Sequence, residues 1–200
     1  MRAHQIILLG SFITSELSVA ADVFPRIEKV GSTYNLILSP AMESELKKVS
    51  PSFKQYPPNY FPDRIMKSYK FSDKQMLSAV IGDFNGDGKP DAIVQGADSR
   101  GDVVFKIISA DKGYKISFFS RNVDAKATLK LYFPNSTWAS GMHYLEFRPS
   151  GAYFPGMQYR GKTDQCPYDG LAKTMNGDGT RTMDYCWKNG DLTWDGQSGD

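Results

Sequence analysis

The sequence predicts a mainly β domain (an α+β arrangement), built from antiparallel hairpins with one or two short helices near its start. Its 200 residues include twelve Phe, eleven Tyr and three Trp, an aromatic content that suits strands. Alternating apolar and polar runs recur along the chain, and the clearest pair, residues 183–187 and 192–194, flanks Asn189-Gly190. Asn-Gly between two such runs is the strongest short-range signal of a β-hairpin.

Residues 1–20 have the features of a secretory signal peptide. Arg2 gives a positive start, residues 6–13 form an apolar run, and Ser18-Val19-Ala20 is a small-x-small cleavage pattern. A buried first strand is the alternative. The run is too short to span a bilayer, no other segment approaches that length, and no cysteine offers a lipid anchor at the cleavage site. We therefore expect a secreted or periplasmic protein whose residues 21–200 form a single domain.

The expected helices lie before residue 70. Residues 34–38 indicate a strand, after which Ser39-Pro40 supplies an N-cap and a first-turn proline for a helix to about Val49. A second short helix is expected to begin near Pro62. Residues 50–62 are rich in proline and aromatic residues and cannot be regular structure throughout. They form either a packed loop at the edge of the core or an aromatic recognition surface.

The stretch from Asp83 to Asp91 has the ligand pattern of a calcium loop. Oxygen-bearing side chains stand at its positions 1, 3, 5 and 9, and a backbone carbonyl at position 7 can add another oxygen. These groups are Asp83, Asn85, Asp87, Asp91 and the carbonyl of Lys89. Ca²⁺ is bound by about six to eight oxygens in a flexible shell. The flanks, residues 79–82 and 92–94, are short and apolar, which indicates strand, loop, strand rather than an EF-hand.

Residues 82–91 resemble the calcium loop of the FG-GAP/VCBS repeat, a unit found in the blades of integrin α-chain propellers. The resemblance implies that Ca²⁺ is ligated by Asp83, Asn85, Asp87 and Asp91. A propeller needs about four to eight blades, whereas here the motif recurs only in part, at residues 176–179 and 189–195, where turns explain it better. We expect one calcium-loop hairpin and not a full propeller. The alternative is a polar Asn-Gly/Asp-Gly turn that binds no metal.

Further strands follow the loop. They are expected at residues 103–109, 114–119, 128–132 and 144–147. The first two flank Asp111-Lys112-Gly113, which is a hairpin signature. Arg100-Gly101-Asp102 has the integrin-recognition sequence, but its place between two expected strands indicates an ordinary turn.

The chain has few cysteine and histidine residues that could take part in catalysis or bind zinc. Cys166 and Cys186 are the two cysteines, and an even count in an exported protein favours a disulfide between them, with two free buried thiols as the alternative. No histidine lies near them in sequence, so a zinc site is not expected. His143 is the one histidine after residue 20, and we do not expect an enzyme. The net charge of +2, with scattered Lys and Arg, gives no nucleic-acid footprint.

These observations favour an exported calcium-binding protein with a structural or interaction role, in which Ca²⁺ rigidifies residues 83–91. Its partner would be a protein or an envelope or glycan component. The alternative is a secreted or periplasmic hydrolase, or a hydrolase inhibitor, that uses the aromatic residues near 56–61 as its contact surface. A third possibility is a purely structural component of the periplasm or matrix with no discrete ligand.

Overall fold

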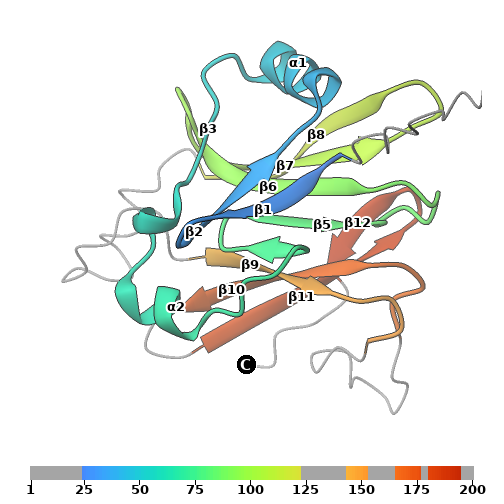
Figure 1. Cartoon of the computed structure of the whole chain (residues 1–200). Helices are drawn as coiled ribbons and strands as arrows, with labels where there is room; N and C mark the ends of the chain where they lie inside the picture. The colour runs from blue at the N-terminus through green and yellow to red at the C-terminus, as the bar shows by residue number, and fades with distance from the viewer. Residues whose placement is uncertain (1–23, 123–142, 153–164, 177–179, 195–200) are drawn as a thin grey trace, which may run out of the picture.

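The computed structural model describes residues 24–122, 143–152, 165–176 and 180–194. These residues form a mainly β fold of antiparallel sheets with two short α-helices, and the described strands close into neither a barrel nor a propeller. Figure 1 shows one sheet in green to yellow above a second sheet in orange to red, with helix α1 at the far side of the first. The predicted fold class is therefore confirmed.

The larger sheet has six strands. They are β3 (Lys54–Gln55), β4 (Gln75–Met76), β5 (Ala79–Gly82), β6 (Asp91–Asp98), β7 (Gly101–Ser109) and β8 (Tyr114–Asn122). The order is β4-β5-β6-β7-β8, and β3 pairs with the last residues of β6. Strand β5 pairs with the first residues of β6, so that Gly82 lies opposite Asp91. The loop that joins these two strands is the predicted calcium loop.

The smaller sheet has four described strands. They are β9 (His143–Arg148), β10 (Gly170–Asn176), β11 (Thr180–Lys188) and β12 (Asp191–Trp194), in the order β12-β11-β10-β9. The β11–β12 turn confirms the strongest hairpin prediction. Asn189 has φ +53° and Gly190 has φ +81°, as a two-residue hairpin turn requires.

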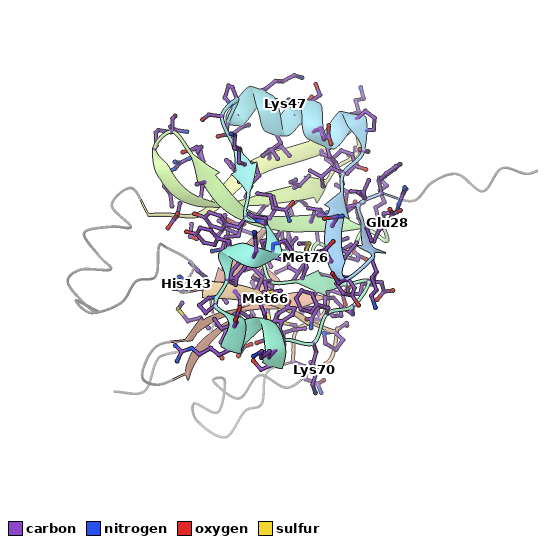
Figure 2. All side chains as sticks on the ribbon, turned by 60° about the vertical axis from the view of Figure 1, so that its left-hand side comes forward. Glu28, Lys47, Met66, Lys70, Met76 and His143 are labelled. Atoms are coloured by element: carbon purple, nitrogen blue, oxygen red, sulfur yellow. A yellow bond between two sulfur atoms is a disulfide. The ribbon has the colours of Figure 1, made fainter. Side chains whose placement is uncertain are left out.

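The remaining elements all lie before β4 in the sequence. They are the hairpin of β1 (Arg26–Val30) and β2 (Thr33–Ile37), helix α1 (Pro40–Val49), the 3-10 turn η1 (Pro58–Tyr60) and helix α2 (Asp63–Ser68). Both predicted helices are present, and the Ser39 hydroxyl caps α1 by accepting a hydrogen bond from the Met42 amide at 3.2 Å. Strand β1 was not predicted. Figure 2 shows α1 at one end of the molecule, with Lys47 on its outer side.

The two sheets pack face to face through one apolar core. Its buried members are Val80, Phe84, Ile93, Val104 and Ile108 from the larger sheet and its loop, and Leu145, Leu171 and Leu192 from the smaller sheet. The opposite face of the larger sheet is covered by α1, whose Met42 and Leu46 pack on it. Strands β6 and β7 are therefore covered on both faces, which explains their long apolar runs.

Residues 56–61 do not form an aromatic surface. Tyr56 and Phe61 are buried in a cluster that includes side chains of α2. The rings of Tyr56 and Tyr60 stack with their centroids 3.9 Å apart, and the Tyr56 hydroxyl donates a hydrogen bond to the Asp102 carboxylate. The prediction of a packed loop is confirmed. Because the rings of Tyr56 and Phe61 are buried, neither is available to the recognition surface on which the hydrolase or inhibitor alternative depended.

Several predictions fall outside the described residues. The signal peptide at residues 1–20 and the strand at 128–132 lie there, as do residues 177–179 of the second Asn-Gly-Asp-Gly sequence. Asn176, the first residue of that sequence, is paired with Thr180, the residue after it, across β10 and β11. In the described ranges, none of the helices has the length and apolar character needed to cross a membrane.

The β6–β7 turn is held by a buried carboxylate. Both oxygens of Asp98 accept hydrogen bonds from the Arg121 guanidinium at 2.7 Å, and the Ser50 hydroxyl and Arg100 amide donate at 2.9 and 2.8 Å. The Asp98 side chain is 1% exposed. The paired bonds from Arg121 hold the pKa of Asp98 well below its usual range. Arg100 lies in this turn, and Gly101 and Asp102 begin β7.

We predict that Asp98→Asn lowers the free energy of unfolding at pH 7 by about 2–3 kcal/mol, because it removes the charge that pairs with Arg121. A carboxyl whose folded pKa is lowered contributes its stability above the ordinary Asp pKa of about 3.9 and loses it as the pH falls through the folded pKa. The difference between variant and wild type should therefore shrink from pH 7 to pH 3. Urea unfolding at both pH values measures it.

Asp73→Asn, at an exposed position, is the control for the loss of one carboxylate. It should change the unfolding free energy by less than about 0.5 kcal/mol at either pH. An Asp98→Asn variant as stable as wild type at pH 7, or a difference that grows on acidification, would contradict the assignment.

Candidate metal centre

The predicted calcium loop spans the turn between two buried antiparallel strands, β5 and β6. All four residues of β5 are buried, and the first six residues of β6 are buried as well. The loop therefore leaves and enters the centre of the larger sheet, and the positions of its two ends are fixed by the strand pairing. The strand, loop, strand arrangement predicted from residues 79–94 is present.

The first loop residue, Asp83, folds its carboxylate back over the turn. Its Oδ1 accepts hydrogen bonds from the amides of Gly86 and Asp87 at 2.8 and 3.0 Å, and its Oδ2 accepts one from Gly88 at 2.9 Å. Gly86 and Gly88 have φ of +77° and +78°. This left-handed conformation, which glycine adopts without steric cost, directs the three amides toward one carboxylate.

The last loop residue, Asp91, is fully buried beside Ser109 of β7. Its Oδ2 accepts a hydrogen bond from the Phe84 amide at 2.9 Å, and its Oδ1 lies 2.7 Å from both the amide and the hydroxyl of Ser109. Burial raises the pKa of Asp91 to about 6, although these hydrogen bonds act to lower it. Asp91 thus ties the end of the loop to the neighbouring strand.

The middle ligand positions also converge on Ser109. The Ser109 hydroxyl lies 2.8 Å from Asp87 Oδ2, and the Asn85 amide group donates a hydrogen bond to the Ser109 carbonyl at 3.1 Å. Burial raises the pKa of Asp87, whereas hydrogen bonds from the Lys89 amide, from Ser109 and from Asn85 lower it. The hydrogen bonds have the larger combined effect, so the pKa of Asp87 is lowered. The Lys89 ammonium lies 4.0 Å from Asp87 Oδ2.

Ser109 is a site residue that sequence analysis missed. It contacts the side chains of three predicted ligands, Asn85, Asp87 and Asp91, although it lies 18 residues beyond the last loop residue in the sequence. In the sequence it is only the last residue of an apolar run. Its position next to the Asp111-Lys112-Gly113 turn gave no signal of a role in the loop.

The segment just before β10 contacts the loop. Asp169 accepts a hydrogen bond from the Asp83 amide at 3.0 Å through its Oδ2, and its own amide donates to the Asp83 carbonyl at 3.2 Å. The ring of Tyr168 lies against Gly86 so closely that a Cβ atom there would overlap it. Phe84, between these contacts, is fully buried in the core between the sheets.

The donor set fits a hard cation, although the side chains are not gathered around one point. Across the described ranges, no group of three or more His, Cys, Asp or Glu side chains is arranged to hold a metal ion. The loop carboxylates instead face backbone amides and Ser109. An ionised carboxylate has about four lone-pair sites, and Asp83 and Asp87 each accept three hydrogen bonds. Each therefore keeps capacity for a further ligand.

The cysteines and the histidine lie apart from the loop ligands. Cys166 and Cys186 form a disulfide with a Cα–Cα distance of 5.4 Å, so the predicted pairing is confirmed. Burial lowers the pKa of His143 to about 3, with a further contribution from Lys173, and the imidazole is neutral at pH 7. Lys173 donates to the Ser120 hydroxyl at 3.1 Å, a hydrogen bond that joins the two sheets.

Comparison of the chain with protein-family models, with curated proteins and with solved structures found no match in any of the three. The resemblance of residues 82–91 to the FG-GAP/VCBS loop stays a prediction. The function proposed below rests on the residues of the loop and on their contacts.

The two loop glycines give a matched test of this geometry. Both have positive φ, but Gly88 faces open space, whereas a Cβ on Gly86 would overlap Tyr168. We predict that Gly88→Ala lowers the unfolding free energy by about 1 kcal/mol, the cost of the left-handed conformation alone. Gly86→Ala should lower it by about 2–3 kcal/mol, because the Tyr168 ring must also leave its place. Chemical unfolding in EDTA measures both.

Tyr168→Ala provides the check on this interpretation. In that background, Gly86→Ala and Gly88→Ala should have similar effects, because the overlap at Gly86 is gone. Equal effects of the two substitutions in the wild-type background would show that Tyr168 does not lie on the loop.

Proposed function

We propose that the chain is an exported calcium-binding protein in which Ca²⁺ rigidifies the loop of residues 83–91. The loop would act as a single unit of the FG-GAP/VCBS type, placed in a sandwich of two sheets rather than in a propeller. The role proposed for it is structural or interactive and not catalytic. Three features of the described residues support this proposal: the position of Ser109, the oxygen-only donor set and the contacts of the loop with both sheets.

The position of Ser109 is the observation that carries the proposal. Its hydroxyl lies 2.8 Å from Asp87 Oδ2 and 2.7 Å from Asp91 Oδ1. A hydroxyl has one proton and can donate to only one of these oxygens at a time. The other close contact therefore needs a proton on a carboxyl group or a nearby positive charge. The Lys89 ammonium, 4.0 Å from Asp87 Oδ2, supplies part of that charge on the Asp87 side. Ca²⁺ at the loop would supply that positive charge without protonation of Asp91.

The proposed ligands are the side chains of Asp83, Asn85, Asp87 and Asp91 and the backbone carbonyl of Lys89. All are hard oxygen donors, and the three carboxylates bring enough negative charge to favour a divalent cation. Glycines within the loop allow it to adjust around a large ion. Mg²⁺ requires a small and nearly octahedral arrangement and keeps several waters, so we expect it to bind less well here.

The contacts of the loop explain how the ion could act on the whole fold. Asp91 and Ser109 connect the loop to β7, Phe84 places it in the core, and Asp169 connects it to the smaller sheet. An ion that restrains the loop would therefore restrain the junction between the two sheets. We infer that this stiffened end of the sandwich presents a surface to a partner outside the cytoplasm, either a protein or an envelope or glycan component.

The disulfide supports the proposed location. Disulfides persist in secreted and periplasmic proteins and are rare in the cytosol. Millimolar Ca²⁺ is usual in extracellular surroundings, where sites with a Kd of roughly 10⁻⁴–10⁻³ M are sufficient. The proposed signal peptide at residues 1–20 and the Cys166–Cys186 bond are therefore consistent with a weak extracytoplasmic calcium site.

We predict that 10 mM Ca²⁺ raises the melting temperature of the chain by about 3–10 °C over its value in EDTA. A ligand at about a ten- to hundredfold excess over Kd stabilises the folded state by about 1.4–2.7 kcal/mol, and each kcal/mol corresponds to roughly 2–4 °C for a domain of this size. Mg²⁺ at the same concentration should give a smaller rise. Calorimetric melting measures both effects.

Asp87→Ala should abolish the calcium-dependent rise, because it removes a central carboxylate of the proposed site. Asp111→Ala is the matched control, since Asp111 is an exposed carboxylate in the β7–β8 turn next to the loop and is not one of the proposed ligands. It should keep the rise. Equal melting temperatures of the wild type in EDTA and Ca²⁺ would mean that the loop is a hairpin turn without metal.

A further inference from the structure

The outer contact of the loop belongs to a short segment that begins at a disulfide. Residues 166–169, which we call the latch, start at Cys166 and end next to Gly170, the first residue of β10. Cys166 and Cys186 are both buried, and Cys186 lies within β11. The latch is therefore fixed to the smaller sheet at both ends, by a covalent bond at one and by strand pairing at the other.

The latch holds the first residue of the loop by its backbone. The Asp83 amide donates to Asp169 Oδ2 at 3.0 Å, and the Asp169 amide donates to the Asp83 carbonyl at 3.2 Å. The second carboxylate oxygen of Asp169 accepts from the Ser150 amide at 3.1 Å. Gly82 permits the close approach, because a Cβ there would lie 2.9 Å from Asp169 Cβ. These bonds leave the Asp83 carboxylate free to face the turn.

The latch also covers the turn of the loop. The Tyr168 ring lies against Gly86, between the third and fifth ligand positions, while 39% of the residue stays exposed to solvent. Asp169 and Tyr168 thus contact the loop at its first and fourth residues. Both contacts depend on where the chain runs after Cys166, and the disulfide to β11 restricts that course.

We propose that the latch couples the Cys166–Cys186 disulfide to calcium binding at residues 83–91. The inference rests on the proposed calcium function. With the disulfide intact, the latch restrains the loop at Asp83 and Gly86, so less ordering is needed when the ligands close around the ion. With the disulfide reduced, the segment before Asp169 loses its anchor and the loop binds more weakly. Linkage requires that bound Ca²⁺ favours the oxidised form by the same factor.

The redox step is an ordinary thiol–disulfide exchange. A dithiol reductant gives two electrons and two protons to the Cys166–Cys186 bond, which breaks to form two thiols, while the reductant closes its own disulfide. An extracytoplasmic dithiol protein or a small-molecule dithiol can supply this step. Calcium and the reductant would then act on the loop in opposite directions.

The first test measures the Kd for Ca²⁺ by titration calorimetry on the intact oxidised chain and on Cys166→Ser/Cys186→Ser. We expect the double variant to bind about 5- to 20-fold more weakly, within the usual range of coupling between two sites. Asp169→Asn keeps the disulfide but replaces one of the two carboxylate oxygens that accept hydrogen bonds from the Asp83 and Ser150 amides. This variant should also bind Ca²⁺ several-fold more weakly than the wild type. This second variant tests the latch even if the double cysteine variant does not fold.

Asp191→Asn is the matched control for Asp169→Asn. Asp191 also joins the two sheets through its carboxylate, by an ion pair with Lys106, but it belongs to β12 and not to the latch. The Asp191→Asn variant should bind Ca²⁺ with the same Kd as the wild type. If Asp191→Asn loses as much affinity for Ca²⁺ as Asp169→Asn does, the loss is a general effect of weaker packing between the two sheets. That result would overturn the proposed coupling through the latch.

The second test has a readout other than calcium binding. The wild-type chain is equilibrated in dithiothreitol redox buffers with EDTA or with saturating Ca²⁺, and free thiols are counted by alkylation and mass spectrometry. Calcium should shift the thiol–disulfide equilibrium constant of Cys166 and Cys186 toward the disulfide by the same 5- to 20-fold factor. The Asp87→Ala variant should show no such shift.

The two tests separate the two proposals. If the oxidised wild type binds no Ca²⁺, the proposed function is wrong and the coupling falls with it. If the wild type binds Ca²⁺ but folded latch variants have the same Kd, and calcium does not shift the reduction equilibrium, the calcium site stands and the latch is wrong.

Discussion

The packing of the two sheets against each other is the constraint on which the rest of this structure depends. Strands β6 and β7 are buried on both faces, by α1 on one side and by the smaller sheet on the other. Phe84, the second residue of the loop, is fully buried between the sheets. Burial of a Phe side chain contributes about 2–3 kcal/mol. The core therefore fixes the place of the loop before any ligand is considered.

The polar contacts of the loop follow from that placement. Since Phe84 is held in the core, Asp83 lies beside the smaller sheet and Asp91 lies beside β7, where each meets a partner from another strand. Asp91 is buried with its charge opposed by its surroundings, and Ser109 cannot satisfy two carboxylates with one proton. A loop that is positioned by apolar packing and carries three carboxylates beside the Lys89 ammonium is well suited to a divalent cation that adds rigidity and no chemistry.

Local patterns predicted much of this fold, because hairpins, caps and turns are specified by neighbouring residues. Ser39-Pro40 predicted the start of α1, and Asn189-Gly190 predicted the β11–β12 hairpin. The residues proposed as calcium ligands were identified in the same way, from their spacing in residues 83–91. Strand β1 was missed because only one of its five residues is buried, so it has no clear apolar alternation. Ser109 and Asp169 were missed because their contacts span 18 and 86 residues and leave no local pattern.

The most direct test of the calcium site is a crystal structure of the chain grown in Ca²⁺, with anomalous scattering used to identify the ion. We expect one calcium peak at the loop, about 2.3–2.6 Å from oxygens of Asp83, Asp87 and Asp91. The Ser109 hydroxyl should then donate to only one carboxylate. A loop without an anomalous peak in saturating Ca²⁺, with Asp87 and Asp91 still meeting at Ser109, would contradict the account.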